Sequence, residues 1–126
     1  MPNLPRNKKQ SHGKREPTGD RKFYKSRRWA AIRKDQLQSY PLCEVHRAAG
    51  FLVAAEVIDH VIRMTDGGSQ SDNMNLMSLC STCHDRKSAL ERRGLQIEHT
   101  TNELSEICPT FVGRHDIVKK LIDLLP

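Results

Sequence analysis

Two pairs of potential metal ligands constrain the fold of this chain more than any other feature. The first pair is Cys43-x-x-His46 and the second is Cys80-x-x-Cys83. A gap of two residues lets one tight turn present both side chains to the same ion, and three cysteines with one histidine suit tetrahedral zinc. The two pairs lie far apart in the sequence, so a shared zinc ion would close a long loop and tie distant segments together.

The sequence leaves alternatives to this zinc site open. Cys43 also fits the role of a small buried hydrophobe. Cys108 competes with His46 for the fourth ligand position, although the spacing favours His46. Residues 80–84, C-S-T-C-H, match the attachment pattern of c-type haem as well, but that interpretation leaves the first pair without a role. Disulfides are disfavoured in the reducing compartment that we expect for this chain.

The composition predicts one small domain with a basic arm. The chain has 126 residues, of which 37% are hydrophobic, so its core is thin and a bound metal would stabilise it. Residues 1–34 hold 12 of the 21 Lys and Arg residues but 2 of the 15 acidic residues. Such an arm suits a polyanionic partner. Residues 1–20 show no apolar period and are predicted to form a basic disordered arm.

Hydropathy gives a prediction about the compartment. No stretch approaches the roughly 18 apolar residues of a membrane span. The basic N-terminus is not followed by the apolar region of a secretory signal. We therefore expect a cytoplasmic protein with no membrane partner.

Apolar periodicity predicts that the main domain spans residues 21–94. Its first helix is expected to be capped by Ser26, to bury Trp29 and to stop before Pro41.

Two strands and a second helix should follow. Residues 53–60 and 76–79 have the composition of short strands. The second helix is expected to be capped by Ser81 and to end at Gly94.

Residues 95–126 are expected to form a helical extension that packs on the domain. Thr100-x-x-Glu103 resembles a capping box for a short helix. An apolar stripe over residues 114–125 predicts a last helix.

A longer set of residues occurs in a fixed order between residues 23 and 91. It consists of the two Cys/His pairs and, around them, Phe23-Tyr24-x-Ser26-x-x-Trp29, Asp59-His60, Gly67-Gly68, Asn75-Leu76-x-x-Leu79 and His84-x-x-Lys87. Each piece is weak alone, but the ordered set resembles the HNH endonuclease family, in particular its small phage and prophage members. The resemblance implies an α+β fold: a small ββα-metal (His-Me finger) core with a zinc knuckle site, an N-terminal helix and C-terminal helices.

The resemblance also implies a role for each site residue. His60 is expected to be the general base that takes a proton from the attacking water. Asn75 is expected to fix the loop and to hold His60 in orientation through a backbone hydrogen bond. Asp59 and His84 are expected to bind one divalent ion, Mg²⁺ or Mn²⁺, with Ni²⁺ or Co²⁺ as further candidates. A neutral imidazole titrates near neutral pH, which suits a base. Adjacent strand residues point to opposite faces, so we expect a bend at Asp59 or His60.

The implied function is a metal-dependent DNA endonuclease that nicks or cuts double-stranded DNA and leaves a 5′-phosphate and a 3′-hydroxyl. Four basic residues are predicted to contact the DNA backbone: Arg28, Arg33, Arg63 and Lys87. The protein is expected to be a monomer or weak dimer, and a role beside a phage terminase in DNA packaging or processing is a further prediction. The alternative is a non-catalytic zinc-knuckle module that binds DNA or acts as a scaffold.

Overall fold

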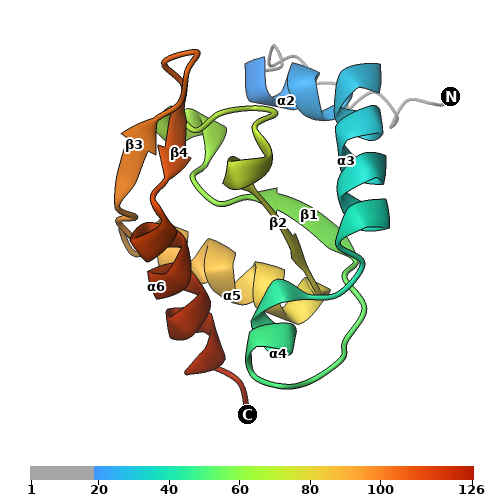
Figure 1. The fold of residues 1–126 in the computed structure, drawn as a ribbon, viewed down its shortest axis with the longest axis vertical. Helices are drawn as coiled ribbons and strands as arrows, with labels where there is room; N and C mark the ends of the chain where they lie inside the picture. The colour runs from blue at the N-terminus through green and yellow to red at the C-terminus, as the bar shows by residue number, and fades with distance from the viewer. Residues whose placement is uncertain (1–18) are drawn as a thin grey trace, which may run out of the picture. The chain divides into compact units, whose positions relative to one another are not determined.

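The computed structural model describes residues 19–126 of the chain (Figure 1). The chain divides into two units, residues 1–30 and residues 31–126. The predicted basic arm, residues 1–20, lies outside the described residues except at its end, where helix α2 (Gly19–Tyr24) begins. None of the described helices is long and apolar enough to cross a membrane.

The described part of the first unit holds α2 and the first turn of α3 (Arg27–Ser39). The hydroxyl of Ser26 accepts a hydrogen bond from the backbone N–H of Trp29 at 3.1 Å, which confirms the predicted N-cap. Trp29 is buried, as expected, and its ring packs against those of Phe23 and Tyr24 at centroid distances of 5.5 and 5.2 Å. These contacts make a small aromatic cluster at the start of α3.

The second unit is built on a two-stranded sheet and the helix that follows it. Strands β1 (Val57–His60) and β2 (Leu76–Leu79) pair antiparallel over their whole length. The loop between them contains two short 3₁₀ helices, η1 (Met64–Asp66) and η2 (Asn73–Asn75). Helix α5 (Ser81–Arg92) leaves directly from β2 (Figure 1). This strand–loop–strand–helix order confirms the predicted ββα core.

Two predicted boundaries in this core are shifted. The strand expected at residues 53–60 is regular over its last four residues alone. Cys80 is the N-cap of α5, and Ser81, the expected cap, is the first helical residue. The backbone N–H of Ser81 instead donates to the carboxylate of Glu56 at 3.1 Å, and negative charge is favourable at a helix N-terminus. Gly94 ends the helix with φ of 92°, as predicted.

The prediction of a short helix after residue 100 is wrong, because this segment forms a β-hairpin. Strand β3 (His99–Thr101) pairs antiparallel with β4 (Ile107–Pro109). The turn between them is organised by Asn102, whose Oδ1 accepts hydrogen bonds from the N–H groups of Leu104 and Glu106, both at 2.9 Å. A side chain that bonds to nearby backbone in this way competes with helix formation. The C-terminal part therefore holds one helix rather than several.

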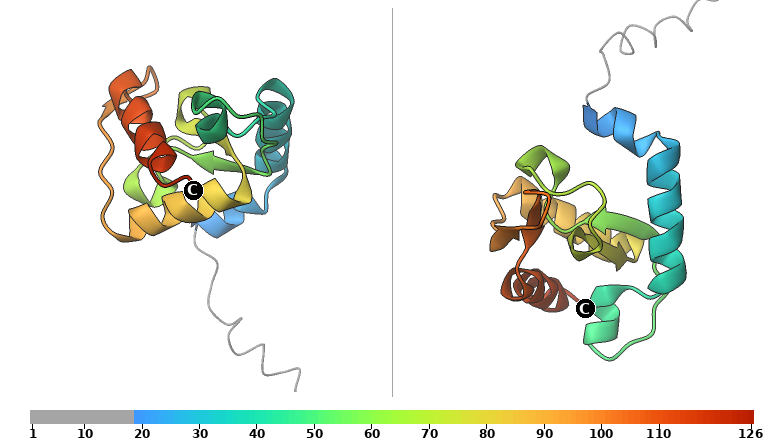
Figure 2. Two further views of the ribbon diagram at one scale, coloured as in Figure 1. Left: turned by 90° about the horizontal axis from the view of Figure 1, so that it is seen from below. Right: turned by 45° about the horizontal axis from the view of Figure 1, so that its top comes forward.

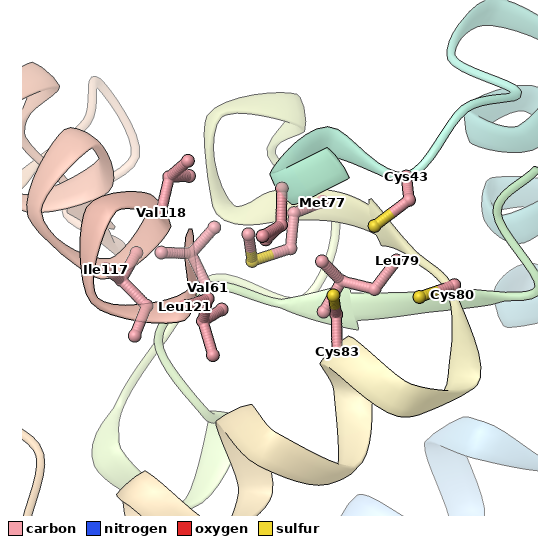
Figure 3. Packing of buried hydrophobic residues seen from close by; sticks show 10 residues of the cluster. Cys43, Val61, Met77, Leu79, Cys80, Cys83, Ile117, Val118 and Leu121 are labelled. Atoms are coloured by element: carbon pink, nitrogen blue, oxygen red, sulfur yellow. The ribbon is translucent and has the colours of Figure 1, made fainter. Parts of the chain in front are cut away.

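Helix α6 (Phe111–Ile122) completes the core of the second unit. Thr110 caps it by accepting a hydrogen bond from the N–H of Gly113 at 2.9 Å. The helix lies beside α4 (Glu44–Ala48) and α5 (Figure 1, Figure 2). Three of its apolar side chains are buried. These are part of one buried cluster, which contains Cys43, Val45, Val61, Met77, Leu79, Cys80, Cys83, Ile117, Val118 and Leu121 (Figure 3).

One guanidinium group joins α6 to two other segments of the second unit. Arg114 makes a two-pronged ion pair with Glu44 of α4, with N···O distances of 2.7 and 3.0 Å. The same group donates to the carbonyls of Met74 and Leu76, at 2.8 and 2.7 Å. Arg114 therefore holds together α4, α6 and the segment that leads into β2. A bidentate pair of this kind is stronger than an ordinary surface ion pair.

Replacing Arg114 with Met should lower the free energy of unfolding by about 1–3 kcal/mol, because charge-assisted hydrogen bonds are lost and Glu44 loses its partner. Urea unfolding followed by circular dichroism measures the change. The matched control is Arg93→Met, at an exposed arginine after α5, which should change the value by less than about 0.5 kcal/mol. Equal effects of the two replacements would contradict the role of Arg114.

Candidate metal centre and active site

The four predicted zinc ligands meet between α4 and α5. Cys43 and His46 lie at the start of α4 and within it, and Cys80 and Cys83 lie at the cap and in the first turn of α5. His46 Nδ1 is 3.4 Å from the sulfur of Cys43 and 3.6 Å from those of Cys80 and Cys83. The three sulfur atoms turn toward one another (Figure 3). All four ligand atoms lie within 4.8 Å of one another.

These separations fit a single tetrahedral ion. Zinc bonds of about 2.3 Å to sulfur and about 2.0 Å to nitrogen, set at the tetrahedral angle, put the nitrogen about 3.5 Å from each sulfur. The three observed distances from His46 Nδ1 match that value. Burial, and then the nearby thiols of Cys80 and Cys43, raise the pKa of the Cys83 thiol. A cation would compensate the thiolates that such burial disfavours, so the four residues fit structural zinc.

Cys108 is not the fourth ligand of this group. It lies in β4, where its sulfur is 3.8 Å from Asn102 Nδ2. Burial, together with the negative charge of Asp72, raises the pKa of the Cys108 thiol to about 11. The sequence left open whether Cys108 or His46 is the fourth zinc ligand, and the structure places His46 in the four-ligand group. His84, which directly follows Cys83, also lies outside the four-ligand group.

His60 ends β1 as a buried imidazole held by the β1–β2 loop. Its side chain is 1% exposed, and its Nε2 lies 2.9 Å from the backbone oxygen of Gln70. A carbonyl oxygen accepts hydrogen bonds and cannot donate them, so Nε2 carries the proton and Nδ1 is the basic nitrogen of the neutral ring. Sequence reasoning missed Gln70, because any residue can supply a backbone carbonyl and no side-chain signal marks it.

Asn75 fastens that loop at two points. The side chain is fully buried, and its Nδ2 donates to the carbonyls of Ile62 and Ser69 at 3.0 and 2.8 Å. Its Oδ1 accepts the N–H of Ile62 at 2.8 Å. All these bonds go to backbone groups, so Asn75 acts on the loop and not on the imidazole itself. The loop in turn carries Gln70, which contacts His60.

Gly68 is the residue that allows this loop to close. A Cβ atom at this position would lie 2.0 Å from the carbonyl oxygen of Ile62 and 2.9 Å from Asn75 Nδ2. Both atoms belong to the network that Asn75 makes, so neither can move without breaking it. A residue with a side chain is therefore excluded at this position.

The carboxylate of Asp59 contacts helix α5, whereas the ring of His60 contacts the β1–β2 loop. Its Oδ1 accepts the N–H of His60 at 2.9 Å, and its Oδ2 lies 2.9 Å from the ammonium of Lys87 on α5. The pairing of β1 with β2 stays regular through His60, which is paired with Leu76. The predicted bend at residue 59 or 60 is therefore wrong, and the bend follows at residues 61–62.

The predicted phosphate contact of Lys87 is also wrong for this structure. Its side chain is 0% exposed, so it cannot reach a DNA backbone. The ammonium group donates to the carbonyl of His60 at 2.8 Å and to Glu91 at 2.6 Å, besides its ion pair with Asp59. Lys87 therefore fixes α5 against the end of β1. The sequence could not reveal this, because a lysine on a helix is normally solvated.

The three predicted arginine contacts stay at the surface. Arg28 is exposed on α3. Arg33 is also exposed and donates to the carbonyl of Glu56 at 3.4 Å. Arg63 donates to the carboxylate of Asp66 at 2.9 Å, and this hydrogen bond raises the pKa of Arg63. Contact with DNA remains a prediction for these three residues.

Asp59 and His84 have the chemistry to hold a divalent ion. Asp59 Oδ2 is buried and, beside its ion pair, takes no hydrogen bond from the described residues, so it has lone pairs left for a cation. His84 lies in the first turn of α5 with 34% of its side chain exposed. Residues three apart share a helix face, so His84 lies on the face of α5 that carries Lys87, the ion-pair partner of Asp59. An ion held by these two groups would keep positions for substrate and water.

Purified protein should contain about one zinc ion per chain, measured by inductively coupled plasma mass spectrometry. Cys83→Ser should remove the zinc and abolish the cooperative thermal transition, because metal binding and folding of a small core are coupled. The control is Cys108→Ser, which changes a buried cysteine outside the group and should keep the zinc. Loss of zinc from both variants, or from neither, would contradict the assignment.

Lys87→Met should lower the free energy of unfolding by about 3–5 kcal/mol, because it leaves the carboxylates of Asp59 and Glu91 without a buried counter-charge. Urea unfolding measures this value, and Lys120→Met, at an exposed position on α6, serves as the control. A loss below about 1 kcal/mol would mean that the ammonium is not needed there.

Comparison with known proteins agrees with this geometry. A family model described as HNH endonuclease matches residues 43–90. Among solved structures, the HNH endonuclease of the deep-sea thermophilic bacteriophage GVE2, determined with a manganese ion, is similar. Its sequence is 29% identical, the likeness covers 75% of this chain and 100% of that one, and the TM-score is 0.57. A comparison with curated proteins gave no match.

The matched residues begin at Cys43 and end within α5, so they contain all four ligands of the zinc group together with Asp59, His60, Asn75 and His84. The arrangement of β1, β2 and α5 is found in the same residues. Residues 43–90 therefore match an HNH endonuclease domain, and the fold around them is similar to that of a phage HNH endonuclease.

Proposed function

We propose that this nuclease hydrolyses phosphodiester bonds in double-stranded DNA, with His60 as the general base. The observation that carries the proposal is the bond from His60 Nε2 to the backbone oxygen of Gln70, at 2.9 Å inside the protein. Because Nε2 keeps its proton and donates it in that hydrogen bond, Nδ1 is the atom that would accept a proton from the attacking water. Burial restricts the ring to one orientation, which is what a general base needs.

Asp59 and His84 are the proposed ligands of the divalent ion. Mg²⁺ or Mn²⁺ is the proposed ion, Ni²⁺ and Co²⁺ are further candidates, and the manganese in the similar phage structure supports this class. When bound, such an ion neutralises charge on the scissile phosphate and stabilises the leaving oxygen. The bond between phosphorus and the 3′ oxygen breaks, so the products are a 5′-phosphate and a 3′-hydroxyl.

The basic residues support DNA as the substrate. Arg28, Arg33 and Arg63 are the proposed contacts to backbone phosphates, together with the basic N-terminal residues 1–34. Ion pairs with phosphates release counterions, so binding should weaken steeply as salt rises. Each chain would have one active site, built around His60. A monomer would therefore nick one strand, and a weak dimer could cut both strands. The phage source of the similar structure supports a place in phage DNA packaging or processing, beside a terminase.

His60→Ala should reduce the nicking of supercoiled plasmid at least about 100-fold in the presence of Mn²⁺, because the proton acceptor is lost. The assay uses zinc-loaded protein, and zinc content with circular dichroism shows whether the variant is folded. His115→Ala, at an exposed position on α6, is the matched control and should keep full activity.

Full nicking activity of His60→Ala, in protein free of host nuclease, would contradict the proposed role of His60 as general base. If instead neither protein cleaved and both bound DNA equally tightly, the chain would be a non-catalytic zinc-knuckle module. A metal panel on the same plasmid, with His84→Ala beside wild type, tests the second ligand: this variant should need a higher Mn²⁺ concentration.

A further inference from the structure

The β3–β4 hairpin lies outside the residues that match the family, yet it borders the loop that holds His60. The backbone N–H of Ser69 donates to the carbonyl of Ile107 at 2.8 Å, and Gly68 forms a parallel bridge with the same residue. Both views in Figure 2 place the hairpin beside the β1–β2 loop. The loop is therefore attached to β4 by backbone hydrogen bonding one residue before Gln70.

Side chains of the hairpin extend this attachment. The hydroxyl of Ser69, whose residue is 2% exposed, donates to Glu106 Oε1 at 2.9 Å and accepts the N–H of Asp72 at 3.1 Å. Asn102 Nδ2 donates to Asp72 Oδ2 at 2.8 Å and to Glu106 Oε1 at 3.0 Å. One hairpin glutamate and one hairpin asparagine thus reach the loop at residues 69 and 72, on both sides of Gln70.

The charge state of the loop agrees with this network. The hydrogen bond from Asn102, and then the one from the N–H of Met74, lower the pKa of Asp72. Asp72 is therefore ionised at neutral pH and accepts both bonds as a carboxylate. Charge-assisted bonds of this kind are stronger than neutral ones.

We propose that the C-terminal hairpin positions the general base, and that the side chains of Glu106 and Asn102 make the contacts responsible. They hold Ser69 and Asp72, and these residues keep the backbone oxygen of Gln70 on His60 Nε2. Neither side chain touches the reacting atoms, so both are positioning residues. The inference rests on the proposed role of His60 as base.

The hairpin contacts add to those that Asn75 makes with Ile62 and Ser69 of the same loop. The loop contains two consecutive glycines, and Gly67 has φ of 91°, a region that side chains disfavour. Groups that orient a functional side chain through a carbonyl work only if that carbonyl is itself fixed. A displacement of about 1 Å in an active site can cost up to about 100-fold in rate.

Glu106→Ala should lower kcat for plasmid nicking at least about 10-fold while KM changes less than about 2-fold, because the carboxylate accepts a hydrogen bond from Ser69 and a negative group does not attract phosphates. Glu106→Gln should restore most of kcat, since its amide oxygen can still accept from Ser69. The matched control is Glu103→Ala, an exposed glutamate in the turn of the same hairpin, which should behave like wild type. An equal kcat for Glu106→Ala and Glu103→Ala would overturn the proposal.

A second readout does not depend on cleavage. Nitrogen NMR of the imidazole in zinc-loaded protein, without DNA or Mn²⁺, reports which ring nitrogen of His60 carries the proton. Wild type and Glu103→Ala should show the proton on Nε2, and Glu106→Ala should show a mixture of both tautomers. Identical His60 spectra for all three proteins would overturn the proposal even if activity fell.

The two readouts separate this inference from the proposed function. If His60→Ala cleaves like wild type, the proposed function fails, but the spectra still decide whether the hairpin orients the ring. If Glu106→Ala does not fold, Ser69→Ala gives the same test, because it removes the hydroxyl between Glu106 and Asp72 and leaves the hairpin turn intact. This variant should show the same tautomer mixture, and a spectrum like that of wild type would overturn the proposal.

Discussion

The meeting of four ligand atoms at the start of α5 is the constraint on which the second unit depends. Cys43 and His46 bring α4 to the place where β2 ends and α5 begins, marked by Cys80 and Cys83. Three of the four side chains also belong to the buried apolar cluster, so the metal group and the core are one structure. Because the direction of α5 is fixed there, the faces that carry His84 and Lys87 are fixed with it.

The sequence predicted many local features of the two units. The spacing of Cys and His residues predicted the four ligands. Short-range sequence patterns predicted β2, the cap at Ser26 and the end of α5 at Gly94. These features depend on neighbours within a few residues. The hairpin at residues 99–109 was missed, because a capping pattern and an asparagine-led turn differ only in which backbone groups the side chain bonds.

Long-range contacts were the part that the sequence could not supply. The burial of Lys87 depends on three partners from β1 and α5, and nothing in its own segment indicates it. The hold on His60 comes from a backbone oxygen, which is present at every position of every chain. The family pattern therefore points to the chemical groups, while the contacts that orient them are read from the folded unit.

The hairpin and α6 follow α5 in the sequence, which has a consequence for biosynthesis. A ribosome delivers Asp59, His60 and His84 before residues 107–122, so the nascent chain holds these candidate site residues while its core still lacks Ile117 and Leu121. Arg114 and its four hydrogen bonds are missing at that stage as well. The order of synthesis thus places the motif before the segments that pack against it, and a product that stops after α5 would carry the motif without that part of the core.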